Sequence, residues 1–388
     1  MKKHRILRNL LIDLAIAGVG LTVFALFHHV LPRQQQSLGI VIGNPYKQTE
    51  PAGASDAAWP EDGMVLAAAG ASDVTPSATA RGGKNGGRGN TGRGSGGKSN
   101  SGKGSGGMNS KGGSALTDGA DDAAPETADE TPMADKFAEK FTDTVVVTDN
   151  SYSSPDISVT VTEEQSADGR ITYYLADIYL RDVTSFRTAL ARDTYGSGFR
   201  DSVADMAVLN NALLAINGDY YGNTNEGVVI RNGVIYRANR TDCDVCVLYY
   251  DGTMKVIPGA SFTVEDAVRD GAWQAWTFGP ALLDTDGSAL TRFSSTNRMI
   301  SANPRTAIGY YEPGHYCMVV VDGRGTSAGI SLPDLSQLFH DLGCAAAYNL
   351  DGGDSSVMVW NGGVVNDPSR GGRESSDALL IAEVNGHE

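Results

Sequence analysis

Residues 81–114 consist almost entirely of Gly, Ser, Asn, Lys and Arg. Such a segment has almost no apolar side chains to bury, so we expect it to stay disordered. A short acidic linker with two prolines follows it, and the residues before it show no sustained hydrophobic period. The sequence therefore predicts a tether over residues 33–135. One folded domain is expected over residues 136–388, which is long enough for a single sizeable core.

The charge of the chain limits its partners. Among 388 residues, 46 Asp and Glu oppose 31 Lys and Arg, which gives a formal net charge of −15 at pH 7. Nucleic-acid phosphates would be repelled by such a surface. The composition therefore argues against a nucleic-acid partner and favours a site in which selected arginines bind one local anion.

The N-terminus combines a basic tip with a long apolar stretch. Residues 1–8 carry several basic side chains, and Leu10–Leu31 is almost wholly apolar. A helix of that length would span roughly 33 Å, enough for the apolar core of a bilayer. A buried core helix is the alternative, but no polar face repeats along the stretch. Since no small-residue cleavage site follows, we expect residues 1–32 to form a cytoplasmic tip and a transmembrane signal anchor, with the remainder extracellular.

Short strands joined by tight turns alternate with a few helices in the folded part. Hairpins dominate, yet one strand–helix–strand unit is clear at residues 316–350. We therefore predict an α+β (mixed α/β) fold with a mixed, largely antiparallel sheet core and a few packed helices, plus the N-terminal transmembrane helix. The predicted strands and hairpins lie at 157–162, 172–180, 214–217, 227–237, 247–257, 307–311, 316–321, 345–350 and 357–365, and the predicted helices lie at 202–214, 264–270 and 332–342.

Four cysteines allow three pairings. Cys243 and Cys246 form a lone CxxC pair with no second pair at zinc-site spacing and no thioredoxin-like βαβ context. With Cys317 and Cys344, they are interpreted as buried thiols or an optional disulfide.

Three apolar strands end in a carboxylate that neighbours glycine. The carboxylates are Asp219, Asp322 and Asp351. Ligands gather outside the ends of strands, where the turns lie. Each Asp-Gly pair taken alone is better explained as an ordinary turn. Their recurrence after buried strands raises the alternative that the three carboxylates share one site.

Three arginines lie in restricted loops. Arg305 follows Pro304, Arg324 lies in a glycine turn, and Arg373 follows two glycines. Guanidinium groups match phosphate or carboxylate in bidentate geometry. Pairing of each arginine with an aspartate for structural reasons alone is the alternative.

The remaining polar and aromatic candidates carry weaker signals. Ser355 and Ser356 lack the GxSxG elbow of serine hydrolases, and no histidine has a motif-like setting, so these serines are expected to bond the turn or a substrate oxygen. Tyr220, Tyr221 and Trp276 could stack on a sugar or belong to the core. Asp351 and Asp354 could share a cation, but two carboxylates alone are a weak metal signal, so we predict no metal and no cofactor.

The C-terminal part of the chain, about residues 136–385, resembles the phosphodiester glycosidase family. Six motifs occur in the order typical of that family, and the anchor and tether resemble the layout of its bacterial surface members. The matching pieces are Asn217-Gly218-Asp219-Tyr220, Phe278-Gly279-Pro280, Asn303-Pro304-Arg305-Thr306-Ala307-Ile308-Gly309, Val321-Asp322-Gly323-Arg324, Asn349-Leu350-Asp351-Gly352-Gly353-Asp354-Ser355-Ser356, and Arg373 with Ser376-Asp377-Ala378-Leu379.

The resemblance implies hydrolysis of a sugar-1-phosphodiester, with release of the sugar and a phosphomonoester. Carboxylates would stabilise the oxocarbenium-like transition state or activate water. Asp351 or Asp219 is expected as base or nucleophile, and Asp322 as the second carboxylate. The phosphate would be held by Arg305 and Arg324, with Arg373, and substrate hydroxyls by Asn349, Tyr220 and Ser355.

Two other functions remain open at this stage. The same cleft would suit a non-catalytic module that binds surface polysaccharide, or a metal-dependent phosphodiesterase that cuts the other phosphate bond. The expected partners are a glycosyl phosphodiester or surface glycopolymer, and the membrane through the N-terminal helix.

Overall fold

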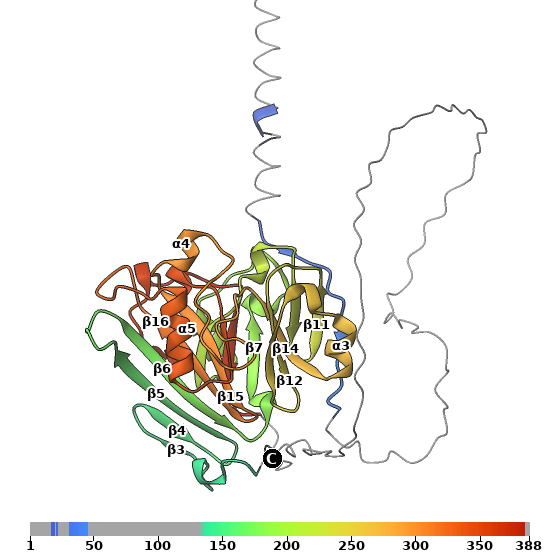
Figure 1. The fold of residues 1–388 in the computed structure, drawn as a ribbon. Coiled ribbons are helices and arrows are strands. Elements are labelled where there is room, and N and C mark those ends of the chain that lie inside the picture. The colour runs from blue at the N-terminus through green and yellow to red at the C-terminus, as the bar shows by residue number, and fades with distance from the viewer. Residues whose placement is uncertain (1–16, 20, 22–30, 46–132, 134, 385–388) are drawn as a thin grey trace, which may run out of the picture. The chain divides into compact units, whose positions relative to one another are not determined.

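The computed structural model describes residues 17–19, 21, 31–45, 133 and 135–384 (Figure 1). The predicted disordered segment at 81–114 and most of the predicted membrane anchor lie outside these residues. Within the described part of the chain, no helix is long and apolar enough to cross a membrane. The anchor therefore stays a prediction.

A seven-stranded sheet forms the largest layer. Its strands β5 (Ile157–Gln165) and β6 (Thr172–Leu180) alternate buried and less buried side chains, as the period of two in the sequence requires. Every pairing within the sheet is antiparallel. In spatial order the strands are β17 (Ala346–Asn349), β15 (Arg305–Glu312), β16 (His315–Val321), β6 (Thr172–Leu180), β5 (Ile157–Gln165), β4 (Ser151–Ser153) and β3 (Val146–Val147).

Two further antiparallel sheets complete the β structure. The five-stranded sheet contains β19 (Gly363–Val364), β18 (Met358–Trp360), β9 (Leu214–Asn217), β20 (Asp377–Ile381) and β7 (Phe186–Leu190) in that order. The six-stranded sheet contains β13 (Met254–Ile257), β12 (Val245–Tyr249), β14 (Ala272–Thr277), β10 (Val228–Arg231), β11 (Val234–Ala238) and β2 (Ile40–Val41).

The main core joins side chains of all three sheets. Ile178, Val320, Leu379 and Trp276 belong to one buried cluster. The other face of the seven-stranded sheet packs on α5 (Leu332–Asp341) through Phe339. The other helices are α2 (Val203–Leu209), α3 (Val264–Arg269) and α4 (Asn297–Ile300), and the 3₁₀ helices are Ala138–Lys140, Val183–Ser185, Ala191–Asp193, Tyr221–Asn223, Gly259–Ser261, Gly353–Ser355 and Ser369–Gly371.

The prediction of a sheet-rich, largely antiparallel fold with few helices is confirmed. The helix predicted at 202–214 is shorter than expected. Ser202 caps it by accepting a hydrogen bond from Asp205 N, but the helix ends at Leu209. Asn211 has φ = 50°, a left-handed conformation that cannot continue an α-helix.

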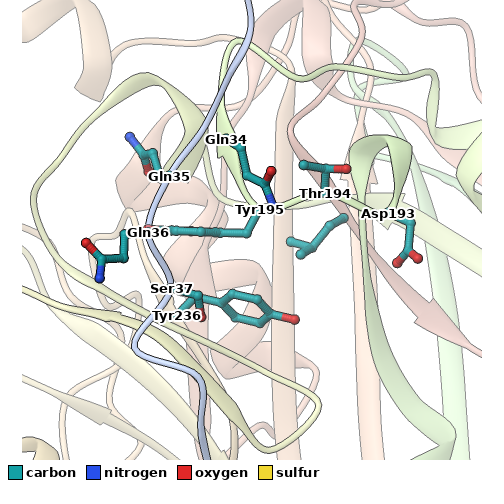
Figure 2. Close-up of a pocket in the computed structure, with 9 residues that line it drawn as sticks. Gln34, Gln35, Gln36, Ser37, Asp193, Thr194, Tyr195 and Tyr236 are labelled. Atoms are coloured by element: carbon teal, nitrogen blue, oxygen red, sulfur yellow. The ribbon is translucent and has the colours of Figure 1, made fainter. Parts of the chain in front are cut away.

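Residues 33–42, here called the N-terminal strap, were expected to belong to the tether but are structured. β1 (Arg33–Gln34) pairs with β8 (Gly196–Ser197), and β2 pairs with β11. The approach of β1 requires glycine at 196, because a Cβ there would lie 2.2 Å from Arg33 O. The strap, Tyr195 and Tyr236 line an open pocket of about 540 Å³ (Figure 2). The strap is therefore part of the folded domain.

All four cysteines are free thiols. Cys243 is exposed, and the other three are buried. The Sγ atoms of Cys317 and Cys344 lie 3.8 Å apart, and burial raises the pKa of the Cys246 thiol. Buried thiols therefore describe three of the four residues.

Candidate active site

Asn217 joins three segments that are distant in sequence. Its Nδ2 donates to Asp351 O at 2.7 Å, and its Oδ1 accepts from Thr306 Oγ1 at 2.7 Å. The Asp351 amide donates in turn to Gly218 O at 3.3 Å. The ends of β9 and β17 and the start of β15 therefore meet at one place, as expected for turns that follow neighbouring strands.

Asp351 lies in a polar cluster at this junction. Arg373 Nη2 donates to Asp351 Oδ2 at 2.8 Å, and Arg373 Nε donates to Ser355 Oγ at 2.9 Å. The Tyr220 ring lies 5.8 Å from the Arg373 guanidinium carbon. Tyr220 is 38% exposed and has φ = 54°, a strained conformation for a non-glycine residue. Four predicted site residues thus come together around one carboxylate.

The environment of Asp351 favours proton transfer. Its side chain is 13% exposed, and its Oδ1 accepts from Gly352 N at 3.0 Å. Burial raises the pKa of this carboxyl, although hydrogen bonding to Ser355 and the charge of Arg373 both oppose the rise. A half-buried carboxyl that is reachable from solvent and has a raised pKa suits a general base or acid.

Arg324 lies on the other side of the same turn. It donates to Asp354 Oδ1 at 2.9 Å and to Asn303 Oδ1 at 3.1 Å, and its side chain is 40% exposed. Gly353 permits this approach, because a Cβ there would lie 3.1 Å from Arg324 Nη2. Hydrogen bonding to Ser369, followed by the contacts with Arg324, lowers the pKa of Asp354. Asp354 is therefore held as an ionised partner of Arg324.

Arg305 is a buried cation. Its guanidinium donates to the carbonyl oxygens of Ile330, Met299 and Ser301. In the described part of the chain, no carboxylate forms an ion pair with it. Burial, with a smaller effect of Arg324, lowers its pKa to about 10, so it stays charged at neutral pH. Arg305 is therefore a buried positive charge near Arg324, with no carboxylate partner among the described residues.

Asp219 is fully buried and has its oxygens occupied. Arg231 Nη2 lies 2.9 Å from Asp219 Oδ1, which also accepts from Tyr221 N at 3.1 Å. Asp219 Oδ2 accepts from Thr277 N at 2.8 Å. The same Nη2 lies 2.8 Å from Asp377 Oδ2. Asp219 is thus part of a buried triad that fixes the loop carrying Tyr220, rather than an open carboxylate.

Asp322 occupies a separate buried position. Its Oδ1 accepts from Asn366 Nδ2 at 2.8 Å, and its Oδ2 accepts from Asp367 N at 3.0 Å. Burial raises its pKa against these two hydrogen bonds. Asn366 Nδ2 also donates to Ser356 O at 3.1 Å, so Asn366 links Asp322 to the segment that follows the Asp351 turn. Among the described residues, no hydrogen bond or ion pair joins Asp322 to Asp351 directly.

Asn349 is held beneath the turn. Its Nδ2 donates to Gly279 O at 2.8 Å, while its buried Oδ1 has no hydrogen-bond partner among the described residues. Tyr221 and Trp276, the other aromatic candidates, are 1% and 0% exposed and belong to the core. Of these three aromatic residues, Tyr220 is the one whose side chain is exposed.

The comparison with family models gives the identity of this region. Residues 210–382 match the model of the phosphodiester glycosidase family, and this range contains every predicted site residue. Residues 210–382 belong to the phosphodiester glycosidase family.

Two curated proteins resemble this phosphodiester glycosidase domain. The SPbeta prophage-derived uncharacterized protein YomE of Bacillus subtilis (strain 168) is 29% identical over 260 residues, covering 61% of this chain and 40% of that protein. The bovine N-acetylglucosamine-1-phosphodiester alpha-N-acetylglucosaminidase is 34% identical over 76 residues, covering 19% of this chain and 14% of that protein. The chain thus spans less than half the length of either relative.

Two solved structures are also similar. The catalytic domain of zebrafish N-acetylglucosamine-1-phosphodiester alpha-N-acetylglucosaminidase, auto-inhibited by its pro-peptide, has a TM-score of 0.49 and 20% identity, covering 59% of this chain and 83% of that one. A hypothetical protein from Synechocystis has a TM-score of 0.46 and 13% identity, covering 58% and 62%.

Sequence reasoning about this phosphodiester glycosidase-family domain missed the partners of Asp219. Arg231 ends the apolar strand β10, and Asp377 begins β20, and both are buried. A charged residue that directly follows Val228-Val229-Ile230 was the available signal, because such a position rarely holds a charge without a buried partner. Among the described residues, no group of three or more His, Cys, Asp or Glu is arranged to hold a metal.

Proposed function

We propose that this protein hydrolyses glycosyl-1-phosphodiesters, with Asp351 as the reacting carboxylate. The observation that carries the proposal is the contact of half-buried Asp351 with Arg373, together with the exposed Arg324, which pairs with Asp354 of the same turn, and the buried Arg305 near Arg324. A carboxylate beside several guanidinium groups matches a substrate that combines an electrophilic anomeric carbon with an anionic phosphate. The family to which residues 210–382 belong supports the same reaction class.

The proposed reaction breaks the bond between the anomeric carbon and the phosphate oxygen. Asp351 either attacks the anomeric carbon or removes a proton from the attacking water, and water supplies the new sugar hydroxyl. The electron pair of the broken bond leaves with the phosphate, which departs as a phosphomonoester anion. We assign this role to Asp351 rather than Asp219, because the oxygens of Asp219 are occupied by Arg231 and backbone amides.

The arginines would stabilise the leaving group. Arg373 and Arg324 are 44% and 40% exposed and bind aspartates of the turn, so a phosphate could replace those aspartates as their partner. Arg305 would add positive charge from below without exposing a guanidinium. Stabilisation of developing negative charge by pre-positioned cations is a large part of many enzymes' catalysis.

A sugar nucleotide tests the reaction. Full-length protein in detergent micelles is incubated with UDP-N-acetylglucosamine, and products are separated by anion-exchange chromatography. Free sugar with UDP supports the proposal, whereas sugar-1-phosphate with UMP indicates a phosphodiesterase that cuts the other bond. Binding without turnover would indicate a polysaccharide-binding module. Asp322→Asn in the same assay tests the prediction that Asp322 is the second carboxylate.

We also propose that residues 1–32 hold the domain on the outer face of the membrane, where surface glycopolymer would be the substrate. The basic tip before Leu10–Leu31 supports this orientation. Protease added to intact cells should then degrade the domain, and degradation only after lysis would contradict the proposal.

A further inference from the structure

We propose that the groove beside Tyr220 is the binding site for an uncharged sugar ring, the glycone of the substrate. This inference rests on the proposed function and deepens it. The groove has a volume of about 610 Å³ and is lined by Tyr220, Thr277, Phe278, Pro280, Phe293 and Met299, among others. Pockets of this size hold small ligands in many proteins.

The groove is directly connected to the candidate site. Tyr220, which lies near the Arg373 guanidinium, forms part of its wall. Met299 also lines it, and the Met299 carbonyl accepts a hydrogen bond from Arg305. A ligand in the groove would therefore lie beside Tyr220 and Met299, which neighbour Arg373 and Arg305, while Asp351 itself is not a lining residue.

The aromatic lining suits the C–H face of a pyranose. Tyr220 is exposed in a left-handed conformation, which presents its ring to solvent instead of the core. Phe278 and Phe293 are half-buried. Phe278 N donates to Tyr348 Oη at 2.7 Å, which fixes the backbone at this wall. Amphipathic ligands pack one apolar face on such rings while their polar groups reach other partners.

The charges of the groove select among possible occupants. Glu226 and Asp242 are exposed in its wall and Asp244 is half-buried, against one lining cation, Arg292. Carboxylates accept hydrogen bonds from sugar hydroxyls but repel phosphate and uronate groups. A hydrocarbon chain would leave these carboxylates without partners. The phosphate-matching Arg324 and Arg373 are not among the lining residues.

These observations orient the substrate. The uncharged ring lies in the groove, its anomeric carbon is directed toward Asp351, and the phosphate lies against Arg373 and Arg324. The enzyme should therefore discriminate among glycones by charge, and it should depend on Phe293 for sugar binding.

The kinetic test compares two substrates with the same leaving group. UDP-N-acetylglucosamine should be hydrolysed with a kcat/KM at least about tenfold higher than UDP-glucuronic acid. Phe293→Ala should raise KM for the first substrate about tenfold and change kcat little, because the lost contact is made in ground and transition states alike. Phe141→Ala, at a half-buried phenylalanine that packs on Arg181 and does not line the groove, is the matched control and should leave KM unchanged.

A binding measurement separates this inference from the proposed function. Saturation-transfer NMR with free N-acetylglucosamine is recorded on the wild type, Phe293→Ala and Phe141→Ala. Loss of the signal in Phe293→Ala alone, without any hydrolysis by the wild type, would support the groove and overturn only the proposed reaction. Hydrolysis with equal use of both sugar nucleotides, or an unchanged KM and NMR signal in Phe293→Ala, would overturn the groove.

Discussion

Arg373 Nη2 lies 2.8 Å from Asp351 Oδ2, and this pair lies at the surface of a site whose other charged groups are mostly buried. The Asp351 side chain is 13% exposed, whereas that of Arg373 is 44% exposed. The carboxylate is thus mostly buried, while its cationic partner is accessible from solvent. Such a pair supplies a reacting carboxylate, Asp351, and a guanidinium, Arg373, that can exchange this carboxylate for a phosphate group.

Asp351→Asn should lower the rate of sugar release by about a thousandfold or more, because the amide can neither attack nor accept a proton. The melting temperature should change little, since the raised pKa shows that burial already disfavours the charged form. Asp341→Asn, at an exposed aspartate on α5, is the control for removal of one negative charge. Substantial residual activity in Asp351→Asn would exclude Asp351 as the reacting carboxylate.

Arg231→Met should be strongly destabilising. It leaves Asp219 and Asp377 buried without their cation, and removing one member of a buried ion group typically costs about 3–5 kcal/mol. Urea denaturation followed by tryptophan fluorescence measures the loss. Asp354→Ala, which breaks the partly exposed pair with Arg324, should cost only about 1 kcal/mol or less. Comparable losses in the two variants would contradict a structural role for the triad.

The free energy of unfolding should fall relative to an Asp377→Asn variant as the pH rises from 5 to 8. Burial raises the pKa of Asp377 from 3.8 to about 7, against the lowering effect of Arg231. Between these two pKa values the folded state keeps a proton on Asp377 that the unfolded state has released. The contribution of this group to the free energy of unfolding is therefore complete below about pH 4 and is lost as the pH rises through 7. The slope attributable to this one group should not exceed about 1.4 kcal/mol per pH unit. Urea titrations at four pH values give the difference, and parallel curves would show that Asp377 is ionised throughout.

Gly196→Val should release the N-terminal strap from β8, because its Cβ would collide with Arg33 O. Limited proteolysis should then cleave within residues 33–42, and the melting temperature should fall. Gly325→Val, at a glycine with open space around it, is the matched control. The fragment 136–388, which lacks the strap, should likewise melt below the full chain, and equal melting temperatures would show that the strap adds no stability.

Much of the architecture could be predicted from local pattern. Alternating side chains in β6 and the hairpin turns indicated strands with nearly the observed bounds, because burial on one face of a strand requires a period of two. The strap could not be predicted in this way. β1 and β2 are two residues each, and they exist only because β8 and β11 offer edges to which they can pair.

The sequence by itself determined the family, the sheet-rich fold and the set of charged residues at the ends of strands, because glycine turns and apolar runs are local properties. Only the tertiary structure decided which charges meet. It enclosed Asp219 with Arg231 and Asp377, set Asp322 apart behind Asn366, and left Asp351 with Arg373 at the surface. Burial and ion pairing depend on segments more than a hundred residues apart, such as Asn217 and Asp351, so no local pattern could distinguish the three aspartates.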